Sequence, residues 1–127
     1  MGPKPIIIGL DCATPRLVFG EFASEMPRLD ALARRGRYGH LESTTPPITV
    51  PAWTALVTGK DPGQLGCYGF RNRSTHGYDD LFFANASTVR EPTLWNVLSR
   101  LRKRCIILNV PQTYPPSRST ESWTAAF

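Results

Sequence analysis

Two side chains in the sequence combine reactive chemistry with a position beside an expected strand or helix end. Asp11 directly follows the apolar run 6–10, and Thr49 stands two residues before Pro51, which suits the first turn of a helix. The start of a helix offers unpaired backbone N–H groups and a partial positive charge, which favour a phosphoryl group and an alkoxide. A threonine hydroxyl held there is a candidate nucleophile once a base, a metal or local positive charge activates it. The ordinary alternative is that Thr49 only caps the helix.

The carboxylate of Asp11 is a candidate ligand for a divalent metal. In open parallel sheets, ligands bind at the carboxyl ends of the strands, and a carboxylate at such an end suits a hard or borderline cation. If Thr49 follows a neighbouring strand, one metal held by both side chains would activate the hydroxyl. On position alone, this interpretation of Asp11 and the interpretation as a cap of the following turn stay equally open.

Arg71 and Arg73 are candidate substrate ligands, because a guanidinium group binds phosphate through paired hydrogen bonds. They stand in a long stretch, 60–91, that is interpreted mostly as loop, so solvated surface charges are an equally good interpretation. The segment 76–80, HGYDD, is interpreted as a polar loop rather than a metal cluster. The three cysteines are widely spaced and form no CxxC pair, which excludes a disulfide framework and a cysteine zinc site as expectations.

Hydrophobic spacing predicts the elements that must position these side chains. The runs 5–10 (PIIIGL) and 105–110 (CIILNV) carry apolar residues on both faces, which is typical of strands buried in a parallel sheet. Proline near the start and glycine after the end mark the helices. Helices are expected at 27–35, 51–58 and 92–102, a further short strand at 37–43, and a turn at 44–47. This order predicts an α/β fold with helices on both faces of a parallel sheet that contains 5–10 and 105–110.

Three segments in this order resemble the type I phosphodiesterase/nucleotide pyrophosphatase family of the alkaline phosphatase superfamily. They read IIIGLDCATPRLV, MPRLDALARRGRYGHLEST and PPITVPAWTALVTGKDPGQLGCYGF, and the resemblance covers about the first 115 residues. It implies an alkaline-phosphatase-like fold with two divalent metals, usually zinc with manganese as the alternative, and a phosphothreonine intermediate. It also implies that Asp11 is a metal ligand and that Thr49 is the metal-bound nucleophile. Thr54 and Thr58 do not align with the nucleophile and are interpreted as helix positions.

The sequence also departs from the family pattern. Leu65 stands where many members have histidine, and the place of the family's phosphate-binding asparagine falls near Phe70, so Arg71 or Arg73 would take that role. The family's further aspartate and histidine ligands have no convincing counterpart, and the chain is expected to resemble an N-terminal fragment of the catalytic domain. The predicted division is residues 1–116 as this incomplete domain and 117–127 as an irregular tail. The chain alone is expected to hydrolyse phosphodiesters poorly or not at all.

Composition narrows the classes of partner. The net charge of +5 is moderate, and the basic residues cluster at the ends of expected helices, where they meet the negative end of the helix dipole. A nucleic-acid surface would need aromatic residues among the cations, so a phosphate-ester small molecule is expected as partner and nucleic acid is not. The apolar run near the N-terminus is too short for a signal peptide or a membrane span, so the cytoplasm is the expected location. An unpaired sheet edge makes self-association a further expectation.

Three other functions remain as alternatives. A catalytically inactive α/β module that binds phosphate or a partner would keep the fold without turnover. A phosphotransferase similar to the cofactor-independent phosphoglycerate mutases shares the fold and leaves the acceptor open. A sulfatase is disfavoured, because its nucleophile is a modified cysteine or serine in a Cys/Ser-x-Pro-x-Arg setting and this chain has TVPAW at 49–53.

Overall fold

The computed structural model describes residues 4–116 and the backbone of 122–125, and the chain divides into two compact units, Met1–Glu42 and Ser43–Phe127. In unit 1 a π-helical turn, η1, spans Leu17–Glu21, a 3-10 turn, η2, spans Ala23–Glu25, and the helix α1 spans Pro27–Arg35. The predicted helix at 27–35 is confirmed. It begins with Pro27 in its first turn and ends before Gly36, and Arg34 forms an ion pair with Asp30 at 2.9 Å.

The predicted strand at 5–10 is not present. Residues 4–10 have no regular secondary structure, and the side chains of Ile6, Ile7 and Ile8 are between 68% and 84% exposed. A strand buried on both faces needs a neighbouring strand and a layer on each side. No described residue of unit 1 is fully buried and no described backbone pairs with this segment, so neither condition is met. The predicted short strand at 37–43 is also absent from this part of the structure.

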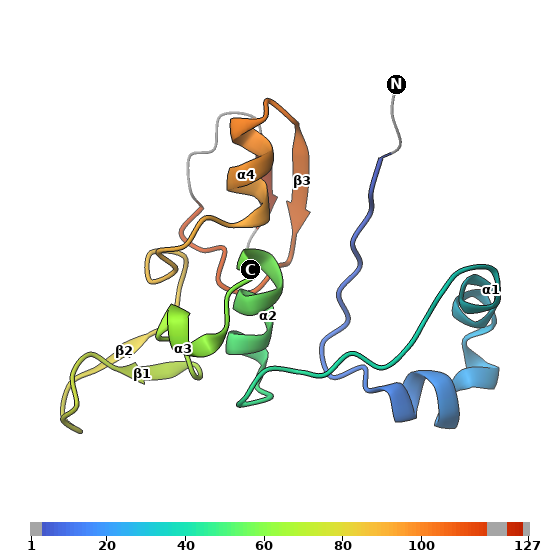
Figure 1. The fold of residues 1–127 in the computed structure, drawn as a ribbon, viewed down its shortest axis with the longest axis horizontal. Helices are drawn as coiled ribbons and strands as arrows, with labels where there is room; N and C mark the ends of the chain where they lie inside the picture. The colour runs from blue at the N-terminus through green and yellow to red at the C-terminus, as the bar shows by residue number, and fades with distance from the viewer. Residues whose placement is uncertain (1–3, 117–121, 126–127) are drawn as a thin grey trace. The chain divides into compact units, whose positions relative to one another are not determined.

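Unit 2 contains the longest helix and all the strands of the described chain (Figure 1). The helix α2 spans Thr49–Thr58 and is followed by the one-turn helix α3, Pro62–Leu65. An antiparallel hairpin joins β1, Arg71–Arg73, to β2, Leu81–Phe83. The helix α4, Leu94–Arg100, precedes β3, Cys105–Leu108. The stretch 60–91 is mostly loop, as predicted, and contains the short elements α3, β1 and β2, which the sequence pattern did not indicate.

The strand β3 pairs in parallel with β4, Ser122–Ala125, from Cys105 opposite Ser122 to Leu108 opposite Ala125. The predicted tail, 117–127, therefore includes one strand, and the remainder of that prediction, 117–121 and 126–127, lies outside the described residues. Mixed helices and small sheets are compatible with an α/β fold. The large parallel sheet covered by helices on both faces is not present among the described residues, which form two two-stranded sheets.

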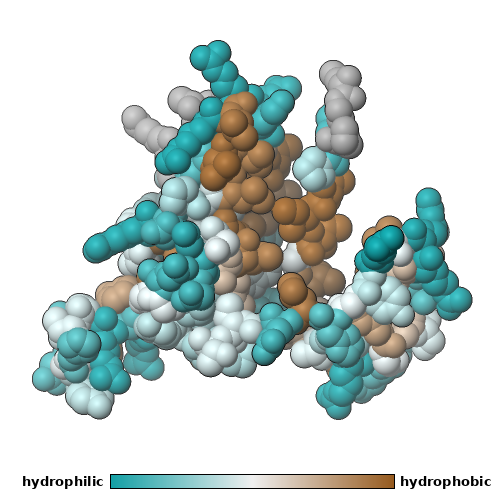
Figure 2. Space-filling view, viewed as in Figure 1, coloured by the Kyte–Doolittle hydropathy of each residue, from teal (hydrophilic) through white to brown (hydrophobic). Residues whose placement is uncertain are grey.

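The core of unit 2 is small. Among the described residues its buried apolar side chains are Val50, Cys67 and Ile107 together with the prolines Pro51 and Pro62. Ile106 and Leu108, on either side of Ile107 in β3, are 75% and 66% exposed, so β3 is buried on one face rather than on both. Figure 2 shows apolar side chains gathered at the surface over α4 and β3. No helix in the described residues is both long enough and apolar enough to cross a membrane.

Candidate functional site

Thr49 is the first residue of α2. The capping position before it is held by Ile48, whose extended backbone places its carbonyl oxygen 3.0 Å from the amide nitrogen of Ala52 and whose side chain makes no capping hydrogen bond. The helix therefore begins two residues before the predicted start at Pro51. Proline is tolerated throughout a first turn because the N–H groups there have no intrahelical acceptor. Thr49 is half-buried, at the positive end of α2.

The residues that follow Thr49 anchor the first turn of α2. Val50 is 0% exposed, and Pro51 and Thr54 are also buried. The hydroxyl of Thr54 donates to the carbonyl oxygen of Val50 at 2.6 Å, and that of Thr58 donates to the carbonyl oxygen of Thr54 at 2.7 Å. Both threonines are therefore helix positions, as predicted, and the packed turn gives Thr49 a fixed backbone.

Asp11 lies in unit 1, in a turn that follows the extended segment 4–10. Its side chain is exposed, and the thiol of Cys12 lies 3.8 Å from its Oδ2 atom. The prediction that Asp11 ends a buried strand is wrong, because no strand forms there. Thr49 belongs to unit 2, and the prediction that the two side chains share a metal stays a prediction.

Arg71 and Arg73 both lie in β1, and both are exposed. Side chains alternate along a strand, so the two guanidinium groups leave the same face of the hairpin, opposite the buried Asn72. The guanidinium carbon of Arg73 lies 4.2 Å from the centroid of the Tyr78 ring, a cation–π contact that holds this side chain over the hairpin. Their role as phosphate ligands stays a prediction.

Sequence analysis passed over Asn72, which fixes the loop before β1. Its Oδ1 atom accepts a hydrogen bond from the backbone N–H of Tyr68 at 2.7 Å, and its Nδ2 atom donates to the carbonyl oxygen of Gly69 at 2.9 Å. Asn72 is 5% exposed. The sequence shows only an asparagine between two arginines. Its burial could not be predicted, because a buried polar side chain depends on hydrogen-bond partners that the sequence does not reveal. Its contacts fix the backbone at Tyr68 and Gly69, directly before β1.

The described residues do not assemble a metal site within either unit. Nowhere among them do three or more histidine, cysteine, aspartate or glutamate side chains gather in a metal-binding arrangement. His76, Asp79 and Asp80, which are exposed in the turn of the hairpin, also form no such group. A zinc ion takes at least three protein ligands. Within the described part of either unit, no cluster of side chains therefore supplies a complete zinc site.

Cys67 is the one buried cysteine among the described residues. Burial raises the pKa of its thiol, and hydrogen bonds with Thr54 and the backbone of Gly69 oppose that rise without reversing it. A thiol reacts as the thiolate. Burial therefore slows modification of Cys67 in two ways: it blocks access of a reagent to the sulfur, and it lowers the fraction of thiolate.

We expect iodoacetamide at about pH 8 to modify Cys67 at least about tenfold more slowly than the exposed Cys12. A buried thiol has both a smaller thiolate fraction and less access to the reagent. Peptide mapping by mass spectrometry measures both rates in one sample, and denaturant should make them equal. Because the folded pKa is raised, the unfolded thiol ionises first, so unit 2 should lose stability as pH rises above the unfolded pKa. Equal rates in the native chain would contradict the burial of Cys67.

Comparison with known proteins gives one match. The profile of the family described as type I phosphodiesterase / nucleotide pyrophosphatase matches residues 5–126. The match spans both units and includes Asp11, Thr49 and the β1 arginines. No curated protein and no solved structure matches the chain.

Proposed function

The chain belongs to the type I phosphodiesterase / nucleotide pyrophosphatase family, and on this premise we propose that it is a phosphoric ester hydrolase with Thr49 as its nucleophile. The observation that supports this role is the position of Thr49 as the first residue of α2, half-buried and followed by the buried Val50. Unpaired N–H groups and the helix dipole stabilise negative charge at that place.

The proposed reaction has two steps. The Oγ1 atom of Thr49 forms a bond to phosphorus while the bond from phosphorus to the leaving oxygen breaks, and the hydroxyl proton passes to solvent. Water then cleaves the phosphothreonine and regenerates the hydroxyl. The helix terminus contributes at the attack step, because the developing charge on the phosphoryl oxygens lies beside the positive end of α2.

The family is generally metal-dependent, and we propose Asp11 and Thr49 as two of the protein's metal donors. Two donors fall short of a complete zinc site. Further donors are therefore proposed to complete the site.

Arg71 and Arg73 are proposed to bind the substrate's phosphate oxygens. Both guanidinium groups are exposed on one face of the hairpin, and both keep donors for a bidentate contact. The matching substrate is a small phosphodiester or a nucleotide-type pyrophosphate, whose charge suits two cations.

The test is to trap the covalent intermediate. The chain is incubated with bis-nitrophenyl phosphate and zinc, quenched in acid, and measured by intact mass and fragment mapping. We expect nitrophenolate to leave and one nitrophenylphosphoryl group to accumulate slowly on Thr49 in the native chain, and on the serine in Thr49→Ser. None should accumulate in Thr49→Val, which keeps the shape and removes the hydroxyl. Thr58→Ala is the matched control, because Thr58 lies on the same helix and bonds only to the backbone. Phosphorylation that persists in Thr49→Val would assign the nucleophile elsewhere, and its absence from the native chain would favour an inactive binding module.

A further inference from the structure

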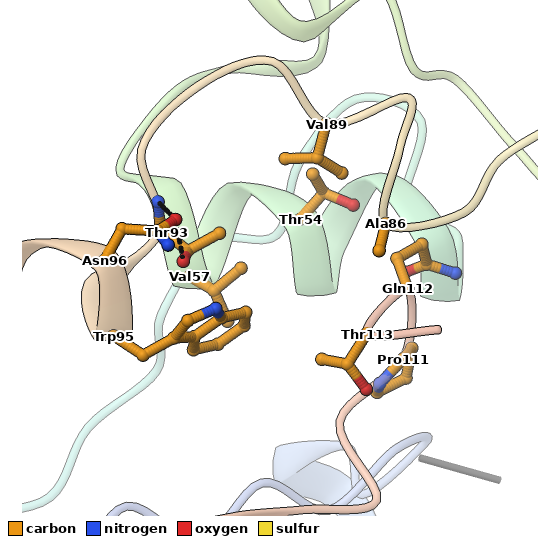
Figure 3. Close-up of a pocket in the computed structure, with 10 residues that line it drawn as sticks. All are labelled: Thr54, Val57, Ala86, Val89, Thr93, Trp95, Asn96, Pro111, Gln112 and Thr113. Atoms are coloured by element: carbon orange, nitrogen blue, oxygen red, sulfur yellow. Dashed lines mark hydrogen bonds between the residues drawn. The ribbon is translucent and has the colours of Figure 1, made fainter. Parts of the chain in front are cut away.

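A cavity of about 110 Å³ lies in unit 2, and Thr49 is not among the residues that line it (Figure 3). Its walls come from four separate parts of the chain. Val57 of α2 and Trp95 of α4 form one side, and the segment 111–113 forms the opposite side. Ala86 closes it from the loop after β2, and the backbone N–H of Ala86 donates to the carbonyl oxygen of Tyr114 at 2.9 Å. This hydrogen bond fastens two of the walls to each other.

Gln112 supplies the cavity with an unused acceptor. Its Oε1 atom is buried and accepts no hydrogen bond from the described residues. Its backbone has a φ of 59°, in the left-handed region that residues other than glycine rarely adopt. The next residue, Thr113, is 5% exposed and donates through its hydroxyl to the carbonyl oxygen of Val110 at 2.7 Å. A buried acceptor without a hydrogen bond is unfavourable. A ligand that donates a hydrogen bond to Oε1 of Gln112 would remove this cost.

The other hydroxyl groups around the cavity also present acceptors. Thr54 donates its proton to the carbonyl oxygen of Val50, and Thr93 donates to Oδ1 of Asn96 at 2.6 Å. Thr113 donates to Val110. Each of these hydroxyl protons is therefore engaged by the protein, and the unused acceptor of the lining is Oε1 of Gln112. A ligand that pairs with this atom must donate a hydrogen bond to it.

The cavity has no ionisable side chain in its lining. Burying an isolated charge without a partner is strongly unfavourable, and the chain's net charge of +5 further disfavours a cation. Neutral ligands are therefore selected. The flat indole of Trp95 and the apolar Val57 suit a planar ring. An engineered apolar cavity of about 150 Å³ binds benzene. The smaller volume here therefore suits a ring smaller than that of benzene.

We propose that this cavity binds a small, neutral, planar N–H heterocycle that donates a hydrogen bond to Oε1 of Gln112 and packs against Trp95. The site differs from the proposed phosphoryl site in its residues and in its chemistry, because its lining carries no cation to pair with the charge of a phosphate. The proposal therefore stands or falls independently of the role of Thr49.

The experiment compares two probes that differ only in the donor. Pyrazole carries an N–H group, and 1-methylpyrazole keeps the ring and lacks it. Titration of each into the native, isotope-labelled chain is followed by the NMR resonances of the Trp95 indole N–H and the Gln112 side-chain amide. We expect saturable shifts with pyrazole at about millimolar affinity, and binding of 1-methylpyrazole at least about tenfold weaker, because it leaves the acceptor unpaired.

Two variants localise the effect. Gln112→Met keeps the length of the side chain and removes the acceptor, so the preference for pyrazole over 1-methylpyrazole should vanish. Ala86→Leu fills the cavity and should abolish binding of both probes, with the native spectrum elsewhere as the check on folding. Equal affinities of the native chain for the two probes would overturn the hydrogen bond to Gln112. Absence of saturable shifts with either probe would overturn the site and leave the acceptor to water alone.

Discussion

Replacing Val50 by aspartate is expected to lower the free energy of unfolding of unit 2 by several kcal/mol. Val50 is 0% exposed, directly after Thr49. The substitution loses the burial of an apolar side chain, about 1.5–3 kcal/mol, and adds the desolvation of a carboxylate, several kcal/mol after relaxation. The helix dipole favours an acidic residue near the start of α2 by only about 0.3–1 kcal/mol. Desolvation therefore decides the result, and we expect a loss of about 4–5 kcal/mol in the free energy of unfolding.

Urea denaturation followed by far-ultraviolet circular dichroism measures this loss. Leu56→Asp is the matched control, because Leu56 lies on the same helix and its side chain is 56% exposed. It should change the free energy of unfolding by no more than about 1 kcal/mol, the range of surface substitutions. Similar losses in the two variants would mean that Val50 is not the buried anchor of α2.

The second large effect concerns turnover by this chain alone. With zinc or manganese added, we expect the chain to hydrolyse bis-nitrophenyl phosphate at a rate within about tenfold of the rate with the same metal in buffer alone. A threonine hydroxyl without a metal or base is a poor nucleophile, and no three metal-binding side chains gather among the described residues. Metal analysis of the purified chain should accordingly find zinc well below one equivalent.

The control for turnover is Thr49→Val, which should leave the slow background unchanged. Fast, metal-dependent hydrolysis that disappears in this variant would show that the chain itself supplies the missing donors. Dependence of such a rate on the square of the protein concentration would assign some of these donors to a second copy. Either result would contradict the inference from the donor set.

Local signals predicted local structure well in this chain. The helix α1 lies where Pro27 and Gly36 placed it, because both act on the backbone within one turn. The start of α4 was predicted at Pro92 but lies at Leu94. There the side chain of Thr93 caps the helix together with Asn96, whose Oδ1 atom accepts from the backbone N–H of Thr93 at 2.9 Å. A capping box competes with proline as the start signal, and the sequence contains both.

Pairing between distant segments was predicted less well. The strands β1 and β2 have three residues each, too few for an alternating pattern to emerge from the sequence. The run 5–10 has the composition of a strand, yet composition supplies no neighbour to pair with. The family could be predicted because its match rests on residue order, while the role of Thr49 as nucleophile stays a prediction. The cavity beside Gln112 could not, since its walls are brought together from segments as distant as Thr54 and Thr113.

The short helix α3 has a consequence for how unit 2 folds. Asp61 and Gln64 satisfy each other's backbone N–H groups at its start, and Gly66 ends it with a φ of 64°. All these contacts span five residues or fewer, so almost no loop-closure entropy is lost in forming them. Four helical residues are far too few to nucleate a helix by propensity alone. The capping box at the start and Gly66 at the end supply the stabilisation that so short a helix lacks. We therefore expect segment 61–66 to form its native turn already in the denatured ensemble, before Cys67 becomes buried.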